Sequence, residues 1–505
     1  MYLIGCDIGT SGTKTVLFDE NGATVASALR EYPLYQPFNG WAEQDPRDWW
    51  EATANGIHEV ISVSGVDPKD VKGVGLSGQM HGLVMLDKND EVIRPSIIWC
   101  DQRTGKQAEE LTDLIGADRL IAVTANPAMT GFTASKILWV KENEPENFER
   151  CAKIMLPKDY IRYMLTGEFA TEVSDASGMQ LLDVPGRCWS KEVLDKIGIR
   201  ENQLGKVYES CEVTGKVTSA AANKTGLTKG TVVVGGAGDQ AACGIGNGIV
   251  KEGIISATIG TSGVVFAHTD KLSIDPQGRV HTLCHAVSGT WHIMGVTQAA
   301  GLSFKWLRDT CFPDTISTSF LLRKDPNALL DMYAEKIPAG SNGLIYLPYL
   351  MGERTPHLDP DARGVFFGLS AIHTRADMIR AVMEGVTYSL CDCLNIIRGM
   401  TGSEPEKIYA SGGGGSSPLW RQMMADAFNA GISRNNSKEG GALGVAILAG
   451  VGAGMYKSVH EACDALISEK DVTKPIAENT AVYAKYYDLY TRLYRDLKDD
   501  FKLLK

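Results

Sequence analysis

Several features that mark other classes of protein are missing from this 505-residue chain. No run approaches the roughly 18 apolar residues of a membrane-spanning helix, so we expect no membrane partner. No basic excess accompanies the net charge of −11, which argues against a nucleic-acid partner. The eleven cysteines lack metal-type CxxC spacing, so they predict thiols in a reducing cytoplasm rather than a metal site or a disulfide framework. The opening MYLIGCDIGT has no basic segment before its apolar run, so we expect a folded strand there and no signal peptide.

Glycine, in contrast, is abundant, and its 54 residues gather in clusters. The clusters GCDIGTSG, GVGLSGQMHG, GGAGDQAACGIGNG, IGTSG, SGGGG and GGALG each adjoin a β-rich run. Between them, residues 46–63 and 374–399 carry apolar side chains at helical spacing. This pattern predicts an α/β protein of two or three domains whose strand ends bend around a ligand.

A short internal repeat divides the chain in two. The segment Ile8-Gly9-Thr10-Ser11-Gly12 recurs at residues 259–263, and an apolar strand follows each copy. One five-residue match could be chance, but the shared context favours a duplicated two-domain architecture. We place the boundary between residues 247 and 248, in a glycine-rich segment suited to a hinge. Only the first copy is flanked by the charged residues Asp7 and Lys14.

The first copy, residues 7–14, reads DIGTSGTK. Backbone N–H groups in such a turn can bind phosphate oxygens, Lys14 adds a positive charge, and Asp7 could hold Mg²⁺ directly or through water. The segment is not a Walker A loop, because the GK[ST] ending is missing and a strand follows. The alternative is a plain β-hairpin with a polar turn.

Residues 232–241 read VVVGGAGDQA and match a dinucleotide-binding fingerprint at Gly236, Gly238 and Ala241. We reject that interpretation, because Asp239 would repel a pyrophosphate and the following AACGIGNGIV looks too short and glycine-rich for a crossover helix. An acid held by glycines at a strand end suits a general base that accepts a sugar hydroxyl's proton during phosphoryl transfer. The alternative is an acidic helix N-cap.

Three further segments carry weaker signals. Residues 411–415, SGGGG, lie between a strand and a helix and could admit a nucleotide base or ribose, or form a flexible loop. His81 and Gln79 at a strand end could bind a polyol, although a lone His is more often structural. The run from Trp99 through Asp101 to Arg103 mixes an aromatic ring, an acid and a guanidinium, which suits a sugar site or an anchored surface turn.

Taken together, these segments resemble the FGGY carbohydrate kinases of the actin, hexokinase and Hsp70 superfamily. The similarity runs from Asp7 to about Leu448, and residues 78–82 and 352–357 resemble the branch of the family that phosphorylates D-xylulose. The matching segments, in the family's order, are residues 7–14, 43–49, 78–82, 238–240, 352–357, 368–385 and 411–414. One segment departs from the pattern: residues 430–440 are polar where an apolar run is expected, which leaves the adenine-pocket wall open.

The resemblance implies two ribonuclease-H-like α/β domains flanking a cleft, with sugar bound by residues 1–247 and Mg-ATP by residues 248–505. The implied reaction is ATP plus D-xylulose giving ADP plus D-xylulose 5-phosphate, with Asp239 as catalytic base and Asp7 at Mg²⁺. The substrate-binding residues it implies are Met80, His81, Trp99, Asp101 and Gln240. Those for ATP and its phosphates are Gly9, Thr10, Ser11, Thr13, Lys14, Gly260, Thr261, Ser262, Gly412, Gly413 and Gly414. Homodimers are common in the family. The alternatives are a kinase for L-xylulose, ribulose or a polyol, and a non-catalytic ATP switch of the actin or Hsp70 type.

Overall fold

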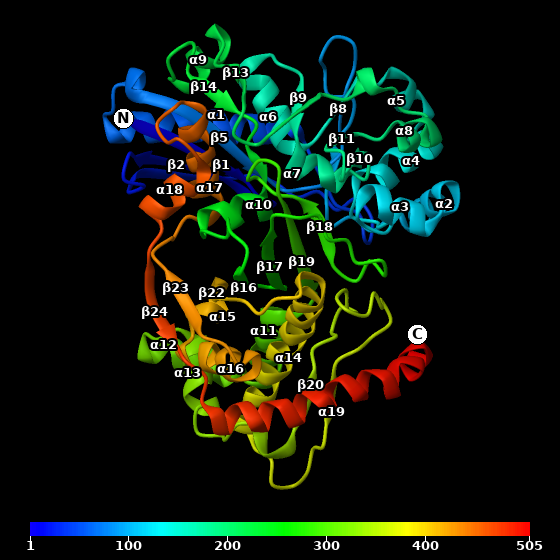
Figure 1. The fold of residues 1–505 in the computed structure, drawn as a ribbon, viewed down its shortest axis with the longest axis vertical. Coiled ribbons are helices and arrows are strands. Elements are labelled where there is room, and N and C mark those ends of the chain that lie inside the picture. Colours follow the sequence, from blue (N-terminus) through cyan, green and yellow to red (C-terminus); the bar gives the residue numbers. More distant parts are fainter. Residues whose placement is uncertain (505) are drawn as a thin grey trace.

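The computed structural model describes residues 1–504, and each of its two lobes is built on a seven-stranded sheet (Figure 1). The upper sheet has the order β13-β14-β5-β1-β2-β3, with β15 also paired to β5. Its strands are β1 (Tyr2–Ile8), β2 (Gly12–Asp19), β3 (Thr24–Glu31), β5 (Val71–Gly78), β13 (Val213–Lys216), β14 (Val232–Val234) and β15 (Ala237–Gly238).

The lower sheet has the order β18-β19-β17-β16-β22-β23-β24. Its strands are β16 (Ile254–Ile259), β17 (Gly263–Thr269), β18 (His281–Cys284), β19 (Trp291–Thr297), β22 (Lys407–Ser411), β23 (Ile432–Asn435) and β24 (Glu469–Thr473).

The two sheets repeat one topology. In each, a central strand (β1 or β16) has two successive antiparallel strands on one side and two successive parallel strands on the other. An antiparallel strand, β13 or β24, then closes the parallel side. This correspondence confirms the duplicated architecture that the repeated Ile8–Gly12 segment predicted.

Alternation along β1 sends side chains to both faces of the upper sheet. Ile4, Cys6 and Ile8 pack with the predicted helix of residues 46–63, found as α1 (Pro46–Ser64). On the other face lies α17 (Gly440–Gly452), which comes from far along the chain. A Cβ at Gly5 would overlap the carbonyl oxygen of Ala442, so the close approach of α17 depends on glycine in the sheet.

Helix α10 (Asp239–Gly246) lies against α17 and joins the two lobes through residues 247–253. Gly444 of α17 meets the carbonyl of Ala242 so closely that no side chain would fit there. Helix α17 and α18 (Val459–Leu466) therefore sit with the upper sheet although they follow the lower one in the chain (Figure 1). The boundary between residues 247 and 248 stays a prediction.

The lower sheet is covered by α14 (Arg375–Thr401), the helix predicted over residues 374–399. Its predicted apolar face is buried and consists of Ile379, Val382, Met383, Val386, Leu390 and Leu394. The other helices of this lobe are α11 (Ala300–Cys311), α12 (Pro313–Leu322), α13 (Pro326–Ala334), α15 (Gly412–Ser416), α16 (Pro418–Phe428) and α19 (Ala477–Phe501).

Smaller elements complete the upper lobe. Its helices are α2 (Gly105–Ile115), α3 (Ala117–Thr124), α4 (Thr133–Asn143), α5 (Pro145–Arg150), α6 (Pro157–Thr166), α7 (Val173–Ala176), α8 (Lys191–Ile197) and α9 (Ser219–Thr225). The two-stranded ribbons pair β4 (Glu43–Gln44) with β7 (Ser96–Ile97), β6 (Val84–Leu86) with β8 (Lys153–Met155), β9 (Ala170–Glu172) with β12 (Lys206–Tyr208), and β10 (Leu182–Asp183) with β11 (Cys188–Trp189). In the lower lobe β20 (Ile345–Leu347) pairs with β21 (Val365–Phe367).

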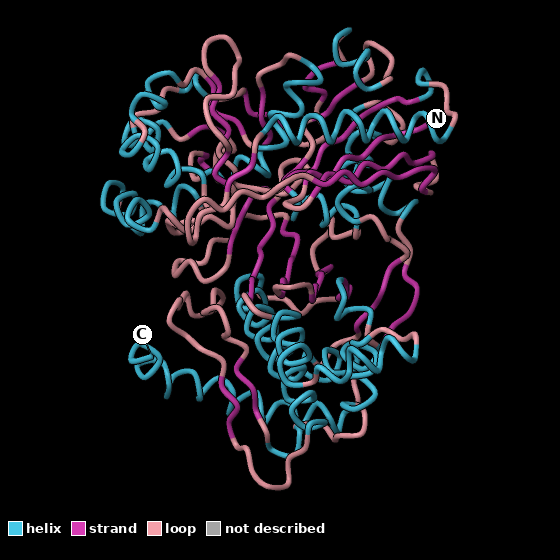
Figure 2. Tube along the Cα trace, turned by 180° about the vertical axis from the view of Figure 1, so that it is seen from behind, coloured by secondary structure: helices cyan, strands magenta, loops and turns pink. Residues whose placement is uncertain are grey.

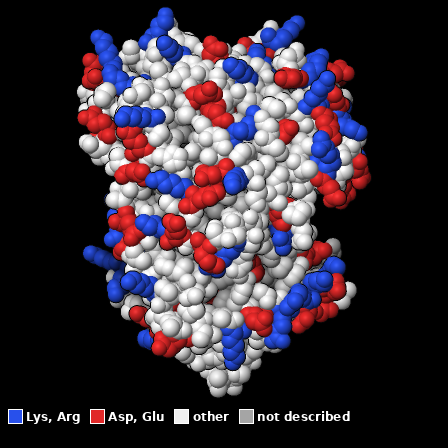
Figure 3. Space-filling view, in the orientation of Figure 1, with Lys and Arg blue, Asp and Glu red and all other residues white. Residues whose placement is uncertain are grey.

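The N-terminus lies in the upper lobe, and the chain ends beside the lower one (Figure 2). Acidic and basic side chains are interspersed on the face shown in Figure 3. Within residues 1–504, no helix is both long enough and apolar enough to cross a membrane.

Candidate active site

The two predicted catalytic carboxylates lie near each other at the edge of the upper sheet. Strand β15 runs parallel to β5, and β5 runs parallel to β1, so the ends that carry Asp239 and Asp7 converge. Ser77 Oγ donates to Asp7 Oδ1 over 2.7 Å. Burial and then the nearby charge of Asp7 raise the pKa of Asp239 to about 7. A carboxyl that titrates near neutral pH can act as a general base.

Asp239 is the first residue of α10, a helix of eight residues, so the glycine-rich segment after it forms a helix that is short, as the rejection of a crossover helix expected. Small residues allow this helix because they let α10 approach α17 closely. Gly238 occupies the N-cap, so the N-cap alternative for Asp239 is wrong. Hydrogen bonds from the backbone and side chain of Gln240 lower the pKa of Asp239 and so oppose part of the effect of burial.

The first predicted phosphate loop is fixed by side chains from other elements. Trp99 Nε1 donates to Thr10 Oγ1 (2.9 Å), and Gln44 Nε2 donates to the Thr10 carbonyl (2.7 Å). Gln79 Nε2 in turn donates to Gln44 Oε1 (2.8 Å). From the sequence, Gln44 belongs to the matching segment 43–49 and Gln79 is a candidate for binding a polyol, but neither residue was expected to hold this loop. The turn is thus held in place before any ligand arrives.

The remaining residues of this loop lie in different environments. The Gly9 N–H closes the turn onto the Gly12 carbonyl at 3.1 Å, while Ser11 is exposed. Thr13 is fully buried in β2. Lys14 forms an ion pair with Glu439, which immediately precedes α17. Binding of phosphate by Gly9, Ser11, Thr13 and Lys14 stays a prediction.

Met80 connects the predicted sugar signature to the base-bearing loop. A Cβ on Gly238 would lie 3.0 Å from Met80 Cγ, so the glycine before Asp239 leaves room for the methionine. Met80 is 5% exposed and also approaches Gly178. The structure therefore brings Met80 next to the residue that precedes Asp239, far away in the chain, and the roles of Met80 and Asp239 stay predictions.

His81 is held in a defined orientation. Its ring stacks on Phe132 with a centroid distance of 4.3 Å, and its Nδ1 lies 2.7 Å from the Gly178 carbonyl. Because a carbonyl only accepts, Nδ1 carries the proton and Nε2 is left as an acceptor. Burial, and next the charge of Lys136, lower the pKa of His81 to about 3, which keeps the ring neutral.

Several residues around His81 were missed in the sequence. Lys136 Nζ donates to the carbonyls of His81 and Gly131, each over 2.8 Å. The sequence signal that could have revealed Lys136 is a lysine among the residues that α4 buries. His281 comes from β18 of the other sheet, and its Nδ1 lies 2.8 Å from Asn126 Oδ1. No feature of the sequence indicated that His281 and Asn126 lie together.

Trp99 and Asp101 have separate environments. Trp99 is 45% exposed beside the first loop, where a ligand could reach its ring. Asp101 is 0% exposed, and its carboxylate accepts from Ala42 N (2.6 Å) and Arg103 Nη2 (2.7 Å). These bonds of Asp101 anchor the turn that carries it. Contact of either residue with a sugar stays a prediction.

A pocket of about 580 Å³ opens in the lower lobe, within the range of small-molecule sites. It joins the second predicted phosphate turn, at Gly260 and Thr261, to Gly413 and Gly414 of α15. The Gly260 N–H closes its turn onto the Ser262 carbonyl at 3.0 Å. Two distant glycine segments that were both expected to contact ATP therefore share one pocket.

The glycine segment of residues 411–415 enters the short helix α15, so the flexible-loop alternative for it is wrong. Gly412 has a φ of 75°, and a Cβ there would lie 2.5 Å from the Ile259 carbonyl oxygen. The pocket's lining residues away from the glycines come mainly from α11 and α13, including Phe304, Arg308 and Asp331. The departure at residues 430–440 therefore lies outside this lining; that segment forms β23 and the loop after it.

Comparisons with known proteins agree with this arrangement. The family model "FGGY family of carbohydrate kinases, N-terminal domain" matches residues 2–246, and its C-terminal counterpart matches residues 255–453. The chain is 39% identical over 498 residues to the xylulose kinase of Bacillus subtilis, covering 99% of this chain and 97% of that protein.

Two solved structures from Lactobacillus acidophilus are similar over 100% of this chain, each with 31% identity and a TM-score of 0.93. One is a ligand-bound xylulose kinase, of which 100% is covered, and the other is a gluconate kinase, of which 99% is covered. Two family models that together span most of the sequence, and relatives similar over nearly its full length, lead to one conclusion: the chain belongs to the FGGY family of carbohydrate kinases.

Proposed function

We propose that the chain transfers the γ-phosphoryl group of ATP to D-xylulose, giving ADP and D-xylulose 5-phosphate. The observation that carries this proposal is the packing of Met80 on Gly238, which brings the proposed sugar signature next to the residue that precedes Asp239. A base adjoining a polyol-binding loop suits proton removal from a sugar hydroxyl. Asp239 takes the proton of the O5 hydroxyl, O5 bonds to the γ-phosphorus, and the bond to the β–γ bridging oxygen breaks.

The binding residues divide between the lobes. His81 Nε2 accepts from a sugar hydroxyl, Met80 and Gln240 flank the reacting end, and Trp99 offers its exposed ring. The proposal places ATP in the 580 Å³ pocket, with its phosphates directed toward the two glycine turns. Closure of the lobes would bring the two substrates together and exclude water, which limits hydrolysis of ATP.

The carboxylates fit a magnesium ion. Asp7 Oδ1 accepts from Ser77, and the other oxygen, Oδ2, lies toward Gly441 at the start of α17. Mg²⁺ commonly binds one or two protein carboxylates and completes its coordination with phosphate oxygens and waters, so one carboxylate such as Asp7 suits it. Asp7 would hold the ion, which neutralises charge on the phosphates when bound.

The relatives favour D-xylulose and suggest a second candidate. The Bacillus subtilis protein and one Lactobacillus acidophilus structure are xylulose kinases, but a gluconate kinase is equally similar in fold. The chain is 39% identical to the xylulose kinase of Bacillus subtilis and 32% identical to the gluconokinase of the same organism, which supports the ketose.

An assay of ADP release against D-xylulose, L-xylulose, ribulose, gluconate and polyols tests the proposal. We expect D-xylulose to stimulate ADP formation most, with one sugar phosphate formed per ADP. Strongest stimulation by gluconate would overturn the substrate assignment, and ATP turnover that no sugar stimulates would favour the ATP-switch alternative.

The eleven cysteines, all free thiols, suit the cytoplasmic location that we propose. Assembly as a homodimer stays a prediction.

A further inference from the structure

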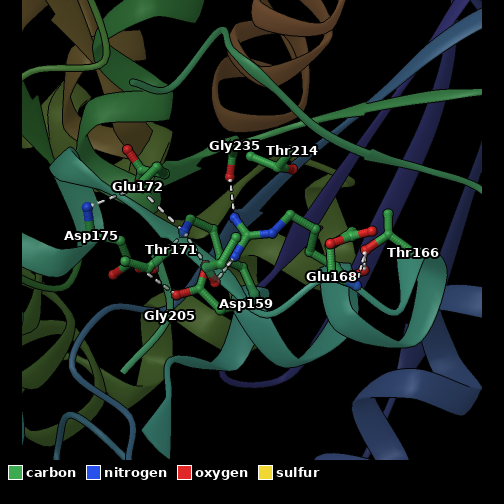
Figure 4. Close-up of polar contacts among 12 residues, drawn as sticks. Asp159, Thr166, Glu168, Thr171, Glu172, Asp175, Gly205, Thr214 and Gly235 are labelled. Atoms are coloured by element: carbon green, nitrogen blue, oxygen red, sulfur yellow. Dashed lines mark hydrogen bonds and ion pairs between the residues drawn. The ribbon is translucent and has the colours of Figure 1, made fainter. Parts of the chain in front are cut away.

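A cluster of five buried charged side chains lies behind the base-bearing loop (Figure 4). None of the five is more than 2% exposed. They are Lys158, Asp159 and Arg162 of α6, Glu172 at the end of β9, and Asp175 of α7. Three acids face two bases, and burial raises the pKa of Asp175 well above its usual value, so a proton on Asp175 leaves the cluster neutral.

This cluster touches the base-bearing loop at two points. Arg162 Nη1 donates to the Gly235 carbonyl over 3.1 Å, a contact visible in Figure 4. The N–H of Gly238, the residue before Asp239, donates to Ser174 Oγ over 3.1 Å. Ser174 Oγ then donates to Glu172 Oε1 over 2.9 Å. A continuous chain of hydrogen bonds therefore links the cluster to the N-cap of α10.

Glu172 is fixed from several sides. Its carboxylate accepts from the Ser174 N–H (2.8 Å), the Asp175 N–H (2.9 Å) and the Ser210 hydroxyl (2.6 Å). Lys158 Nζ also forms an ion pair with Glu172 Oε1 at 3.3 Å. A buried ion cluster contributes little net stability relative to well-packed apolar side chains. Its rigidity does, however, fix the orientation of whatever it bonds, which is what a reacting group needs.

We propose that Ser174 and Glu172 are positioning residues for the phosphoryl-transfer reaction. They fix the Gly238 N–H, and through it they set the direction in which Asp239 leaves the first turn of α10. This inference rests on the proposed role of Asp239 as base. Removing the Ser174 hydroxyl frees Gly238 without touching substrate, so it misplaces the base while the binding surfaces remain.

The test is Ser174→Ala in the full-length protein, with steady-state kinetics for D-xylulose and ATP and a melting curve. We expect kcat to fall about 10- to 100-fold, because a misplacement of about 1 Å can cost 10²-fold, while both KM values stay within about threefold. Ser210→Ala, which loosens Glu172 from the opposite side, should lower kcat in the same direction by less. If Ser174→Ala does not fold, the kcat of Ser210→Ala tests whether Glu172 helps to position Asp239.

Thr171→Val is the matched control. The Thr171 hydroxyl donates to Asp159 Oδ2 over 2.6 Å (Figure 4), within the same cluster and outside the hydrogen-bond chain that runs from Glu172 through Ser174 to Gly238. Its loss should lower the melting temperature and leave kcat unchanged. Wild-type kcat in Ser174→Ala, or an equal fall of kcat in Thr171→Val, would overturn the inference. Full activity in Asp239→Asn would instead remove the role of Asp239 as base, and ADP formation by the wild type that D-xylulose does not stimulate would remove the proposed function, so these failures are distinguishable.

Discussion

Replacing His81 with alanine tests the sugar side at its most constrained residue. The backbone of His81 has a φ of 68°, its ring stacks on Phe132, and its Nδ1 is engaged by the Gly178 carbonyl. Nε2 is therefore the ring atom left for a ligand. Since burial keeps the ring neutral, with a pKa of about 3, Nε2 carries no proton and is the atom that we propose accepts a hydrogen bond from a sugar hydroxyl.

The expected loss follows from that single hydrogen bond. A neutral hydrogen bond contributes about 0.5–1.5 kcal/mol, and a sugar hydroxyl left buried without its partner costs about 1–3 kcal/mol more. Together they correspond to a loss of roughly one to three decades in kcat/KM for D-xylulose. The substitution also removes the ring stack, worth about 0.5–1.5 kcal/mol, and leaves the Gly178 carbonyl without its donor. A lower melting temperature is expected as well.

Kinetics and melting curves on the same preparations separate these effects. Phe132→Leu removes the stack and keeps both ring nitrogens, so it should destabilise the fold while lowering kcat/KM less than His81→Ala does. The KM for ATP should hardly change in either variant, because the proposed nucleotide pocket lies in the other lobe. Wild-type kinetics for D-xylulose in folded His81→Ala would refute the sugar contact. Equal losses for sugar and ATP would show that His81 only packs.

Three further predictions concern the metal, the nucleotide and the base. Asp7→Asn should weaken the Mg²⁺ dependence of turnover and leave sugar binding nearly unchanged; an unaltered metal titration would show that Asp7 is structural. Gly413→Ala should raise the KM for ATP about three- to tenfold at constant stability, because a Cβ there meets no protein atom within 4 Å. Gly414→Ala should instead destabilise the protein by about 1–3 kcal/mol, because its Cβ would lie 2.5 Å from the Ile259 side chain; equal melting temperatures would contradict this contrast. Finally, Asp239 must be unprotonated to act as base, so kcat should rise with pH through its pKa of about 7 and then level off. Mg²⁺ beside Asp7 would move this limb to lower pH, so a kcat that stays constant down to the lowest pH at which the protein remains folded would exclude Asp239 as the titrating base.

The two-lobe fold could be predicted because its determinants are local. The repeated Ile8–Gly12 turn, the apolar runs that follow it and the helical spacing of residues 46–63 each depend on near neighbours in the chain. The packing of α17 on the upper sheet could not be predicted in this way. It depends on Gly5 and Ala442 meeting across more than 400 residues, and a glycine looks the same in a turn and at a close contact.

The candidate site likewise contains residues that the sequence could place and contacts that it could not. Asp7, Met80 and Asp239 could be placed together because each lies within two residues of the end of a strand, and those strands, β1, β5 and β15, run parallel and end at the same side of the upper sheet. The contact of His281 with Asn126 joins two segments with no shared motif, so only the folded chain reveals it. The bonds of Asp101 to Arg103 and to the Ala42 backbone are likewise visible only in the folded chain, and its contact with a sugar stays a prediction.

The most direct test of the account is sugar-dependent ADP formation by Asp239→Asn beside the wild-type protein. The side chain keeps its shape and loses its ability to take a proton, so the fold, the KM for ATP and sugar binding should persist. We expect D-xylulose to stimulate ADP formation by the wild type, and the variant's kcat to be about 10²–10⁴-fold lower. Wild-type turnover of D-xylulose by a folded Asp239→Asn protein would contradict the central claim that this carboxylate accepts the proton of the sugar hydroxyl.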